Sequence, residues 1–315
     1  MTAALILAAG IVSEDSKRKP MDAIDGASSI RRIIMVFKQA GIKKIVVVTG
    51  YDAEEMENHC GRMGVIFLRN NDYNIGDMLS SVRIGLDYLN DKCDKAFITP
   101  ADVSLYSTET VKIMEKSSEP IVIPVCYNKT GHPLLLSQSL FSRVIEYNGS
   151  GGIGGALSGA DAERRFLDVS DEGIFIDVQE YEDITSAVES HDLRQIRAEA
   201  KVYLSCVKNF YGPGTHLLLN LIRETGSLKH AAQRMAVSYS KAIKMIAIAE
   251  EQLGYRLLAT GSGGYPGGGR SEVTKEAMEL MRRYEALESE CSHLVRSAFE
   301  RHFGDMAPIH AMPDS

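Results

Sequence analysis

The sequence has no apolar run long enough to cross a lipid bilayer, a crossing that takes about 20 residues in a helix. Its longest apolar stretch near the start, residues 3–12, is interrupted by Gly10. No basic segment precedes that stretch and no small-residue cleavage pattern follows it, so it does not resemble a secretory signal. We therefore expect a cytoplasmic protein that does not interact with a membrane.

Cysteine is also scarce, and its positions exclude two kinds of architecture. The five cysteines are scattered, odd in number and form no CxxC pair, which argues against a disulfide framework and against a zinc site. We expect reduced core thiols at Cys60, Cys93, Cys126, Cys206 and Cys291.

The charge of the chain is unevenly distributed. Over all 315 residues the net charge is −7, which taken alone argues against a nucleic-acid-binding protein. Residues 1–199, however, hold 21 Lys and Arg against 30 Asp and Glu, whereas residues 200–303 hold 14 against 10. An acidic front part joined to a basic back part predicts two domains with different partners.

Short apolar runs alternate with amphipathic stretches through the first half of the chain. Because these runs are continuous, they predict strands covered on both faces, as in the parallel sheet of an α/β protein. Ligands of such sheets bind beyond the carboxyl ends of the strands, here the loops after Ala9, Thr49, Thr99 and Val125. The predicted strands are residues 4–9, 44–49, 65–68, 96–99 and 120–125, and the predicted helices are residues 28–40, 77–88 and 108–116.

The pattern becomes helical after about residue 185. The segments in order are a polar helical linker at 185–207, helices from Gly214, a glycine-rich segment at 261–269 and a long helix at 274–303. The tail from Gly304 has no periodicity and is expected to be disordered. The resulting division is an α/β domain at 1–190, a second domain at 200–303 and a tail at 304–315.

A loop with phosphate-binding character follows the first predicted strand. Leu7, Ala8, Ala9 and Gly10 lead out of the strand, and Lys19 follows nine residues after Gly10. Such a loop offers backbone N–H groups and a lysine to the oxygens of a polyphosphate. A plain strand and turn with a solvated basic loop is the alternative.

This loop resembles the opening LAAG-x-S-x-R-M-G-x-x-K pattern of the MobA-like nucleotidyltransferases, which include molybdenum-cofactor guanylyl- and cytidylyltransferases and sugar-nucleotide pyrophosphorylases. Residues 7–10 and Lys19 fit the pattern. The departures are Val12, Glu14 and Ser16, which replace its Ser, Arg and second Gly, and one phosphate contact is lost with the Arg. The resemblance implies a Rossmann-like α/β fold over about 185 residues, nucleotide binding by residues 7–10 and a catalytic role for Lys19.

The same resemblance implies roles for four residues further along. Ser81 lies in the helix on the base and ribose side of the nucleotide, Asp102 is catalytic and binds Mg²⁺, Asp177 is a second Mg²⁺ ligand, and His132 is on the substrate side. The structural alternatives are a helix N-cap or a turn former for Asp102, a solvated acidic strand end for Asp177 and a turn histidine for His132. Residues 149–159 contain six glycines but no GKS or GKT signature, and the resemblance implies that they close over the second substrate.

Two short helices joined by a tight turn are predicted in the basic part. A helix from Ser227, a turn at Ala236 and Val237, and a second helix with Ser238 as its N-cap form a helix-turn-helix, whose second helix enters the DNA major groove. The predicted packing positions are Ala231, Ala232, Val237, Ile243 and Ile246. The predicted contacts to phosphates and base edges are Ser238, Tyr239, Ser240, Lys241 and Lys244.

This part of the chain resembles the DNA-binding domain of ModE-type molybdate-responsive regulators, which is related to LysR-type winged helices. The matches include residues 210–214, 226–228 and 238–240, and the glycine-rich segment that ends at Arg270. The resemblance implies a wing at that segment, with Arg270 on a DNA phosphate. The molybdate-binding domains of these regulators have no counterpart in this sequence, so molybdate sensing is not implied. A winged helix used only for protein contacts is the alternative.

Apolar residues recur at spacings of four and three along the last predicted helix, a seam typical of a coiled coil. The seam consists of Leu280, Tyr284, Leu287, Cys291, Leu294 and Ala298. In the related regulators this helix forms the dimer interface, so a homodimer is implied. Packing of the helix onto its own domain is the alternative.

Two functional hypotheses follow. In the first, a Mg²⁺-dependent nucleotidyltransferase joins a nucleoside triphosphate to a phosphorylated acceptor and releases pyrophosphate, while the winged helix binds double-stranded DNA. CTP or GTP as the donor and a molybdopterin-type cofactor as the acceptor come only from the resemblance. In the second, the chain is a transcriptional regulator whose transferase-like domain senses a nucleotide or a cofactor, which Glu14 and Ser16 favour.

Overall fold

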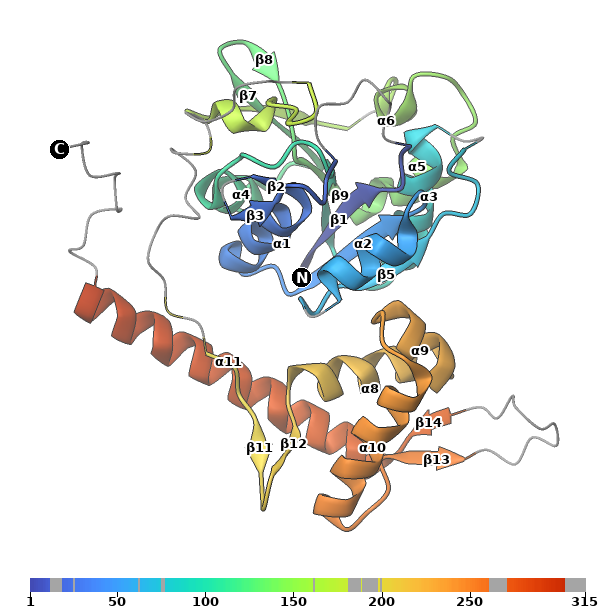
Figure 1. Cartoon of the computed structure of the whole chain (residues 1–315). Helices are drawn as coiled ribbons and strands as arrows, with labels where there is room; N and C mark the ends of the chain where they lie inside the picture. The colour runs from blue at the N-terminus through green and yellow to red at the C-terminus, as the bar shows by residue number, and fades with distance from the viewer. Residues whose placement is uncertain are drawn as a thin grey trace. The chain divides into compact units, whose positions relative to one another are not determined.

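The computed structural model divides the chain into two compact units, Met1–Arg194 and Gln195–Ser315, which are described separately (Figure 1). It describes residues 1–11, 19–24, 26–61, 63–74, 77–160, 162–180, 188, 198, 200–260 and 271–303. The departures at Val12, Glu14 and Ser16, the glycine-rich segment with Arg270 and the tail 304–315 lie outside the described residues. Within the described residues, no helix combines the length and the apolar character that a membrane span requires.

A mixed sheet forms the centre of the first unit, in the order β10-β7-β9-β6-β1-β4-β5, with β8 paired to β7. The strands are β1 (Thr2–Ala8), β4 (Lys44–Thr49), β5 (Ile66–Arg69), β6 (Lys95–Pro100), β7 (Ile121–Cys126), β8 (Lys129–Thr130), β9 (Leu134–Ser137) and β10 (Arg164–Asp168), and β2 (Ala23–Ile24) pairs β3 (Ala27–Ser28) separately. Strand β1 is parallel to both β4 and β6, so its apolar residues 3–6 are fully buried. The predicted α/β fold is confirmed.

Strand β9 departs from the all-parallel expectation because it runs antiparallel to both β6 and β7. It is four residues long, and beyond it β6 is parallel to β1 and β7 is parallel to β10. The sheet is therefore mixed, which is compatible with a Rossmann-like fold that carries an inserted strand.

Helices cover the sheet of the first unit (Figure 1). They are α1 (Ser29–Ala40), α2 (Ala53–Cys60), α3 (Met78–Leu89), α4 (Thr108–Glu115), α5 (Phe141–Glu146) and α6 (Gly152–Leu157), with short 3₁₀ turns at Gln138–Leu140 and Glu172–Ile174. Helix α3 packs directly onto β1, because a Cβ on Gly85 would lie 2.2 Å from a methyl carbon of Leu5. This close packing places the start of α3 beside the carboxyl end of the sheet.

The second unit is a winged helix followed by a long helix (Figure 1). Its elements are β11 (Leu204–Ser205), β12 (Asn209–Tyr211), α8 (Pro213–Thr225), α9 (Leu228–Arg234), α10 (Tyr239–Leu253), β13 (Leu258–Thr260), β14 (Ser271–Val273) and α11 (Lys275–Phe303). The helical linker predicted to reach residue 207 is wrong at its end, because β11 pairs there with β12 in an antiparallel hairpin. Cys206 lies in this hairpin and is exposed, so the expectation of a core thiol is wrong at that position.

A buried polar cluster joins α8 to α11 in the second unit. The hydroxyl of Tyr211 lies 3.0 Å from Nδ1 of His216, and Oε1 of Glu285 lies 3.2 Å from Nε2 of His216. The Tyr284 ring packs edge-to-face against Tyr211 and in a tilted arrangement against His216, with ring centroids 5.0 Å apart in each pair. Burial lowers the pKa of His216, although Glu285 and Glu288 act in the opposite direction.

Acidification should therefore weaken the second unit. The unfolded chain takes up a proton on His216 below a pKa of about 6.5, whereas the folded protein resists that proton, so stability is present above this pH and lost as the pH falls. We expect the melting temperature of the second unit to fall between about pH 7.5 and 5.5. His216→Gln should flatten this dependence, whereas His230→Gln, at an exposed position on α9, should leave it unchanged. Equal pH dependence of wild type and His216→Gln would contradict the prediction.

Candidate functional site

The loop after β1 is held between the loops that follow β4 and β6. The carbonyl of Leu7 accepts a hydrogen bond of 3.0 Å from the N–H of Ala101, and the carbonyl of Ala9 accepts one of 3.2 Å from Tyr51. Residues 7–9, including Ala8, are buried, and Gly10 is exposed with open space around its Cα. The predicted nucleotide-binding residues 7–10 thus lie at the carboxyl edge of the sheet, at the end of β1 and the start of the loop that follows it.

Gly50, in the loop after β4, allows the loops after β1, β4 and β5 to approach closely. A Cβ at this position would lie 2.7 Å from the carbonyl oxygen of Ala9 and 2.7 Å from Cβ of Tyr73. Only glycine fits without moving the backbone, since one obstacle is a main-chain atom. The loops after β1, β4 and β5 therefore approach one another at the edge where ligands of such sheets bind.

Lys19 lies at the same edge of the sheet. Its Nζ is 3.9 Å from a carboxylate oxygen of Asp52, which directly precedes α2, and its side chain is half exposed. Its backbone N–H donates to Asp22 over 2.6 Å. An exposed ion pair of this length is worth at most about 1 kcal/mol, so little energy holds the lysine away from an incoming phosphate.

The structure brings Asp102 and Asp177 together. Val103 and Asp177 form an antiparallel bridge, and the N–H of Val178 donates to the carbonyl of Asp102 over 3.0 Å. Val178 is fully buried and packs with Leu105, which fixes this segment against the loop after β6. The two predicted metal ligands are thus neighbours, although they are far apart in the sequence.

The electrostatics of this pair depend on burial and on like charge. Burial, together with the negative charges of Asp177 and Glu180, raises the pKa of Asp102 to about 6. Asp102 does not cap α4, because the N-cap there is Ser107, whose side chain accepts from the N–H of Thr110. A buried carboxylate next to like charges is a place where a bound cation would relieve repulsion.

The donor set fits a hard cation that is shared with a ligand. Carboxylate oxygens are the ligands that Mg²⁺ prefers, and Mg²⁺ is usually held by one or two carboxylates together with water and substrate phosphates. Among the described residues, no group of three or more His, Cys, Asp or Glu side chains is arranged to hold a metal ion. A Mg²⁺ ion held by Asp102 and Asp177 would therefore need further oxygen ligands, from water or from a polyphosphate.

Ser81 is in the first turns of α3 and is almost fully buried. Its hydroxyl accepts a hydrogen bond of 3.0 Å from the amide nitrogen of Asn70, and Ser80 accepts another of 2.9 Å from the same nitrogen. Asn70 was not among the residues predicted from the sequence. The available signal was a polar residue directly after a buried strand, the position at which α/β proteins place binding groups.

His132 is tied to β6 and to the segment that precedes Asp177. Its N–H donates to the carbonyl of Ile174 over 2.7 Å, and its ring hydrogen-bonds with the backbone of Ile98. Gly131 must be glycine, because a Cβ there would lie 2.3 Å from the same Ile174 carbonyl. Burial lowers the pKa of His132, so the imidazole is neutral at neutral pH.

The glycine-rich segment 149–159 contains α6 and folds back against Tyr147. The hydroxyl of Tyr147 donates to the carbonyl of Ser150 over 2.7 Å, and a Cβ on Gly155 would lie 2.1 Å from that carbonyl oxygen. Arg83 on α3 donates to the carbonyl of Tyr147 and so ties the turn to the helix that carries Ser81.

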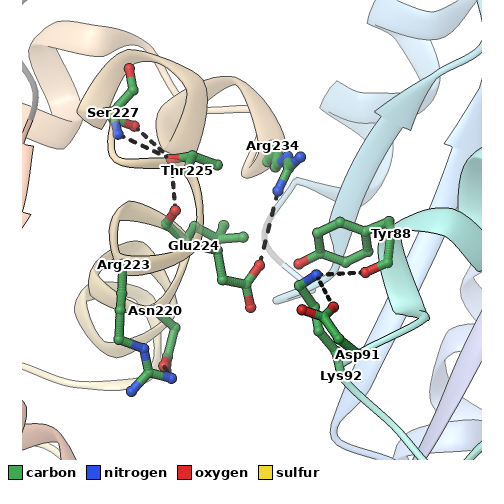
Figure 2. A network of polar contacts seen from close by, with 10 residues as sticks. Tyr88, Asp91, Lys92, Asn220, Arg223, Glu224, Thr225, Ser227 and Arg234 are labelled. Atoms are coloured by element: carbon green, nitrogen blue, oxygen red, sulfur yellow. Dashed lines mark hydrogen bonds and ion pairs between the residues drawn. The ribbon is translucent and has the colours of Figure 1, made fainter.

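Both helices of the helix-turn-helix in the second unit begin at a serine cap, and that of Ser238 was predicted. The hydroxyl of Ser227 accepts from the N–H of His230 over 3.3 Å, and that of Ser238 accepts from Lys241 over 3.2 Å. Figure 2 shows how α8 and α9 are joined, with Thr225 and Ser227 exchanging hydrogen bonds and Arg234 lying 3.9 Å from Glu224. Two capped helices with a turn of this length match the helix-turn-helix geometry.

One face of α10 packs inward and the other is exposed. The buried positions are Ala242, Ile246 and Ala249, and α9 contributes Ala231 and Ala232, with Val237 of the turn half-buried. The exposed positions include Tyr239, Ser240, Lys241 and Lys244. The prediction that Ile243 packs inward is wrong, because its side chain is 44% exposed. Ile243 follows the buried Ala242 and lies about 100° further around the helix, on the exposed face.

The wing strands are connected to the helices that flank them. The N–H of Ser271 in β14 donates to the carbonyl of Gly226 over 2.9 Å, at the junction of α8 and α9. The tip of the wing, with Arg270, lies outside the described residues. The root of the wing is therefore fixed beside the helix-turn-helix.

The residues of the predicted seam on α11 differ in burial. Tyr284 is only 1% exposed and donates from its hydroxyl to the carbonyl of Val202 over 3.0 Å, so it belongs to the core of its own domain. Its assignment to a dimer seam is wrong. Leu287 and Leu294 are exposed, and Cys291 is half-buried.

Two family models match the chain. The model for the MobA-like NTP transferase domain matches residues 4–166, and the model for bacterial regulatory helix-turn-helix proteins of the lysR family matches residues 217–276. No match was found among curated protein sequences.

Several solved structures resemble the first part of the chain. Rv0371c from Mycobacterium tuberculosis H37Rv is 17% identical, with a TM-score of 0.50 over 60% of this chain and 98% of that chain. Its complex with manganese is 19% identical over the same shares, with a TM-score of 0.49. A nucleotidyl transferase from Methanothermobacter thermautotroptrophicus is 19% identical over 54% of this chain and 88% of that chain, with a TM-score of 0.47.

At these identities the likeness to solved structures concerns the fold alone, and the family model carries the assignment. The transferase model spans β1 to β10, which includes the loop after β1, Ser81 and Asp102. The chain belongs to the MobA-like NTP transferase family and carries, in addition, a helix-turn-helix DNA-binding domain of the lysR type.

Proposed function

We propose that the first unit transfers a nucleotidyl group from a nucleoside triphosphate to a phosphorylated acceptor. The observation that carries this proposal is the meeting of Asp102 and Asp177 beside the loop after β6, at the edge where residues 7–10 and Lys19 also lie. An oxygen of the acceptor phosphate attacks the α-phosphorus, the bond from that phosphorus to the bridging oxygen breaks, and pyrophosphate leaves with the bonding electrons. Positioning and charge stabilisation supply most of the catalysis in such transfers.

The residues divide this work by their positions. Backbone N–H groups of residues 7–10 and the ammonium of Lys19 bind the phosphates and stabilise the charge of the leaving pyrophosphate. Asp102 and Asp177 would hold Mg²⁺, which would supply charge neutralisation when bound with the nucleotide. Ser81 contacts the nucleoside, and the neutral imidazole of His132 contacts the acceptor side.

We infer CTP or GTP as the donor and a molybdopterin-type cofactor as the acceptor, because the chain belongs to the MobA-like family. The test is pyrophosphate release from the purified full chain with each nucleoside triphosphate, Mg²⁺ and each candidate acceptor. Acceptor-dependent release supports the enzyme. Nucleotide binding that changes DNA affinity without turnover would overturn it and favour a transcriptional regulator that senses a nucleotide or a cofactor.

We further propose that the second unit binds double-stranded DNA through α10. The exposed face of this helix presents hydroxyl and ammonium groups suited to phosphates and base edges, from Ser238, Tyr239, Ser240, Lys241 and Lys244, and Arg270 in the wing would add a phosphate contact. Affinity for a DNA duplex should fall steeply with salt, and Lys241→Ala should weaken binding and reduce the salt slope by about one. Binding that is insensitive to salt would overturn this proposal.

Exposed apolar residues on α11 support a homodimer. Leu294 is 61% exposed and Leu287 is 39% exposed on the half of the helix that follows Tyr284. A second copy of α11 would cover them in an antiparallel or parallel pair. We expect the wild-type chain to sediment as a dimer and Leu294→Glu to sediment as a monomer, with Glu290→Gln as an exposed control on the same helix. A monomeric wild type would refute the dimer.

Ile243 should read thymine methyl groups in the major groove. It is an exposed β-branched apolar side chain on the same face as Tyr239 and Lys244, and apolar contact with the C5-methyl group is how such side chains recognise thymine. With a duplex selected from random sequence by the wild type, Ile243→Ala should lose about 1 kcal/mol, roughly fivefold in Kd.

Replacing single thymines by uracil isolates this contact, because only the methyl group is removed. At one position the wild type should lose affinity, and Ile243→Ala should lose none further. Met278→Ala, which changes an exposed apolar residue of α11, is the control and should respond to uracil as the wild type does. Identical uracil profiles for the wild type and Ile243→Ala would contradict the prediction.

A further inference from the structure

Asn70 is a buried polar residue whose side chain is fully engaged. It directly follows β5, is 2% exposed, and its Nδ2 donates to the hydroxyls of Ser80 over 2.9 Å and Ser81 over 3.0 Å. Its Oδ1 accepts from the N–H of Asp72 over 3.0 Å, and its own N–H donates to the carbonyl of Thr49 over 2.7 Å. One residue thus connects the ends of β4 and β5 with the first turn of α3.

Helix α3 depends on this connection at its N-terminus. Its N-cap is Asp77, whose side chain makes no capping hydrogen bond. A side-chain cap would satisfy one of the first N–H groups of the helix, which lack partners within it. At α3, the amide of Asn70 instead fixes the first turn from outside, through Ser80 and Ser81.

The hydrogen bonds also set the direction of the Ser81 hydroxyl. Ser80 gives its hydrogen to the carbonyl of Asp77 over 2.8 Å while its oxygen accepts from Asn70. Ser81 accepts from the same amide, so its own hydrogen must point away from Asn70. An amide in this place therefore decides both where the Ser81 oxygen lies and which way its O–H can donate.

We propose that Asn70 is a positioning residue for the nucleoside part of the bound nucleotide, acting through Ser81. This inference rests on the proposed nucleotidyltransferase function. Both N–H groups of the Asn70 amide are already donated to Ser80 and Ser81, so the amide nitrogen has none left for a ligand. The loop to which Asn70 belongs meets the loop after β1 at Gly50. The ligand served by this arrangement is the base and ribose of a nucleoside triphosphate.

The test replaces the amide by a carboxylate of the same size. Asn70→Asp cannot donate to two hydroxyls, so Ser80 and Ser81 must turn their hydrogens toward it. The matched control is Asn90→Asp at the other end of α3, where the amide oxygen accepts from Gln138 over 3.4 Å and a carboxylate can still accept. The probes are the α,β-methylene analogues of CTP and GTP, titrated with Mg²⁺ into the full chain, together with kcat and KM for pyrophosphate release.

We expect Asn70→Asp to weaken binding of the analogue that the wild type prefers by at least about tenfold, which corresponds to 1.4 kcal/mol. KM should rise more than kcat falls, and Asn90→Asp should stay within about twofold of the wild type in both. Ser81→Ala should weaken binding, and the double variant Asn70→Asp/Ser81→Ala should be no weaker than Asn70→Asp alone, since one residue acts through the other.

Four results would overturn the inference. Wild-type affinity in Asn70→Asp would overturn this inference but not the proposed function. A wild type that binds neither analogue would overturn both. Additive losses in the double variant would show that Asn70 acts independently of Ser81. If Asn70→Asp does not fold, as judged by circular dichroism, Ser81→Ala decides, and unchanged binding in that variant overturns the inference.

Discussion

Replacing Asp102 with asparagine is expected to reduce pyrophosphate release at least about 100-fold at every Mg²⁺ concentration tested. The substitution keeps the size of the side chain and one oxygen but removes the negative charge, so Asp177 would face the cation alone. The loss should appear mainly in kcat, because charge stabilisation matters most when pyrophosphate departs. The measurement is the initial rate of pyrophosphate release with saturating nucleotide and acceptor.

Two observations separate this effect from unfolding. Burial and the charges of Asp177 and Glu180 raise the pKa of Asp102, which means that the folded protein disfavours its ionised form. A neutral amide should therefore leave the melting temperature unchanged or raise it. Asp168→Asn removes a carboxylate from the exposed end of β10 and should retain the wild-type rate. Full activity in Asp102→Asn would refute the proposed role of Asp102.

The fold was predictable wherever local patterns decide it. The continuous apolar runs that form β1 and β4 predict strands covered on both faces, and they pair in parallel as expected. Strand β9 could not be placed, because Leu134–Ser137 is short and its antiparallel pairing depends on β6 and β7 leaving a gap between them. Pairing of that kind is a property of the whole sheet and leaves no periodicity in the sequence.

The site shows the same limit at the level of single residues. Asp102 and Asp177 were implied by family resemblance, but Asn70 matters through the hydroxyls that it contacts, and these contacts exist only once α3 has packed on β1. Ile243 was assigned to the core because it is apolar. The buried neighbour is the smaller Ala242, since close packing of α10 requires a small side chain at that position.

Glu250, near the end of α10, connects this helix to the segment that leads into the wing. Its side chain is 10% exposed, and Oε1 accepts from the N–H groups of Leu257 over 2.8 Å and Leu258 over 3.3 Å. Its other oxygen pairs with Arg256 over 2.6 Å. Thr274, which directly follows the other wing strand, holds the same segment, because its hydroxyl donates to the carbonyl of Arg256 over 2.9 Å. The same hydroxyl caps α11 by accepting from the N–H of Ala277. One carboxylate thus ties the helix proposed to read DNA to the start of the wing.

Glu250→Ala is expected to destabilise the second unit by about 2–4 kcal/mol, because the buried N–H of Leu257 and its neighbour lose their acceptor. Glu251→Ala is a matched control one residue away. Glu251 is exposed and pairs with Lys208 over 3.5 Å, a surface contact worth at most about 1 kcal/mol. Urea denaturation of the full chain measures both changes.

DNA affinity should also fall for Glu250→Ala under conditions where the variant remains folded, because β13 loses its fixed angle to α10. The affinity of Glu251→Ala for DNA should be unchanged. Equal stability of the two variants would show that the carboxylate does not hold the wing.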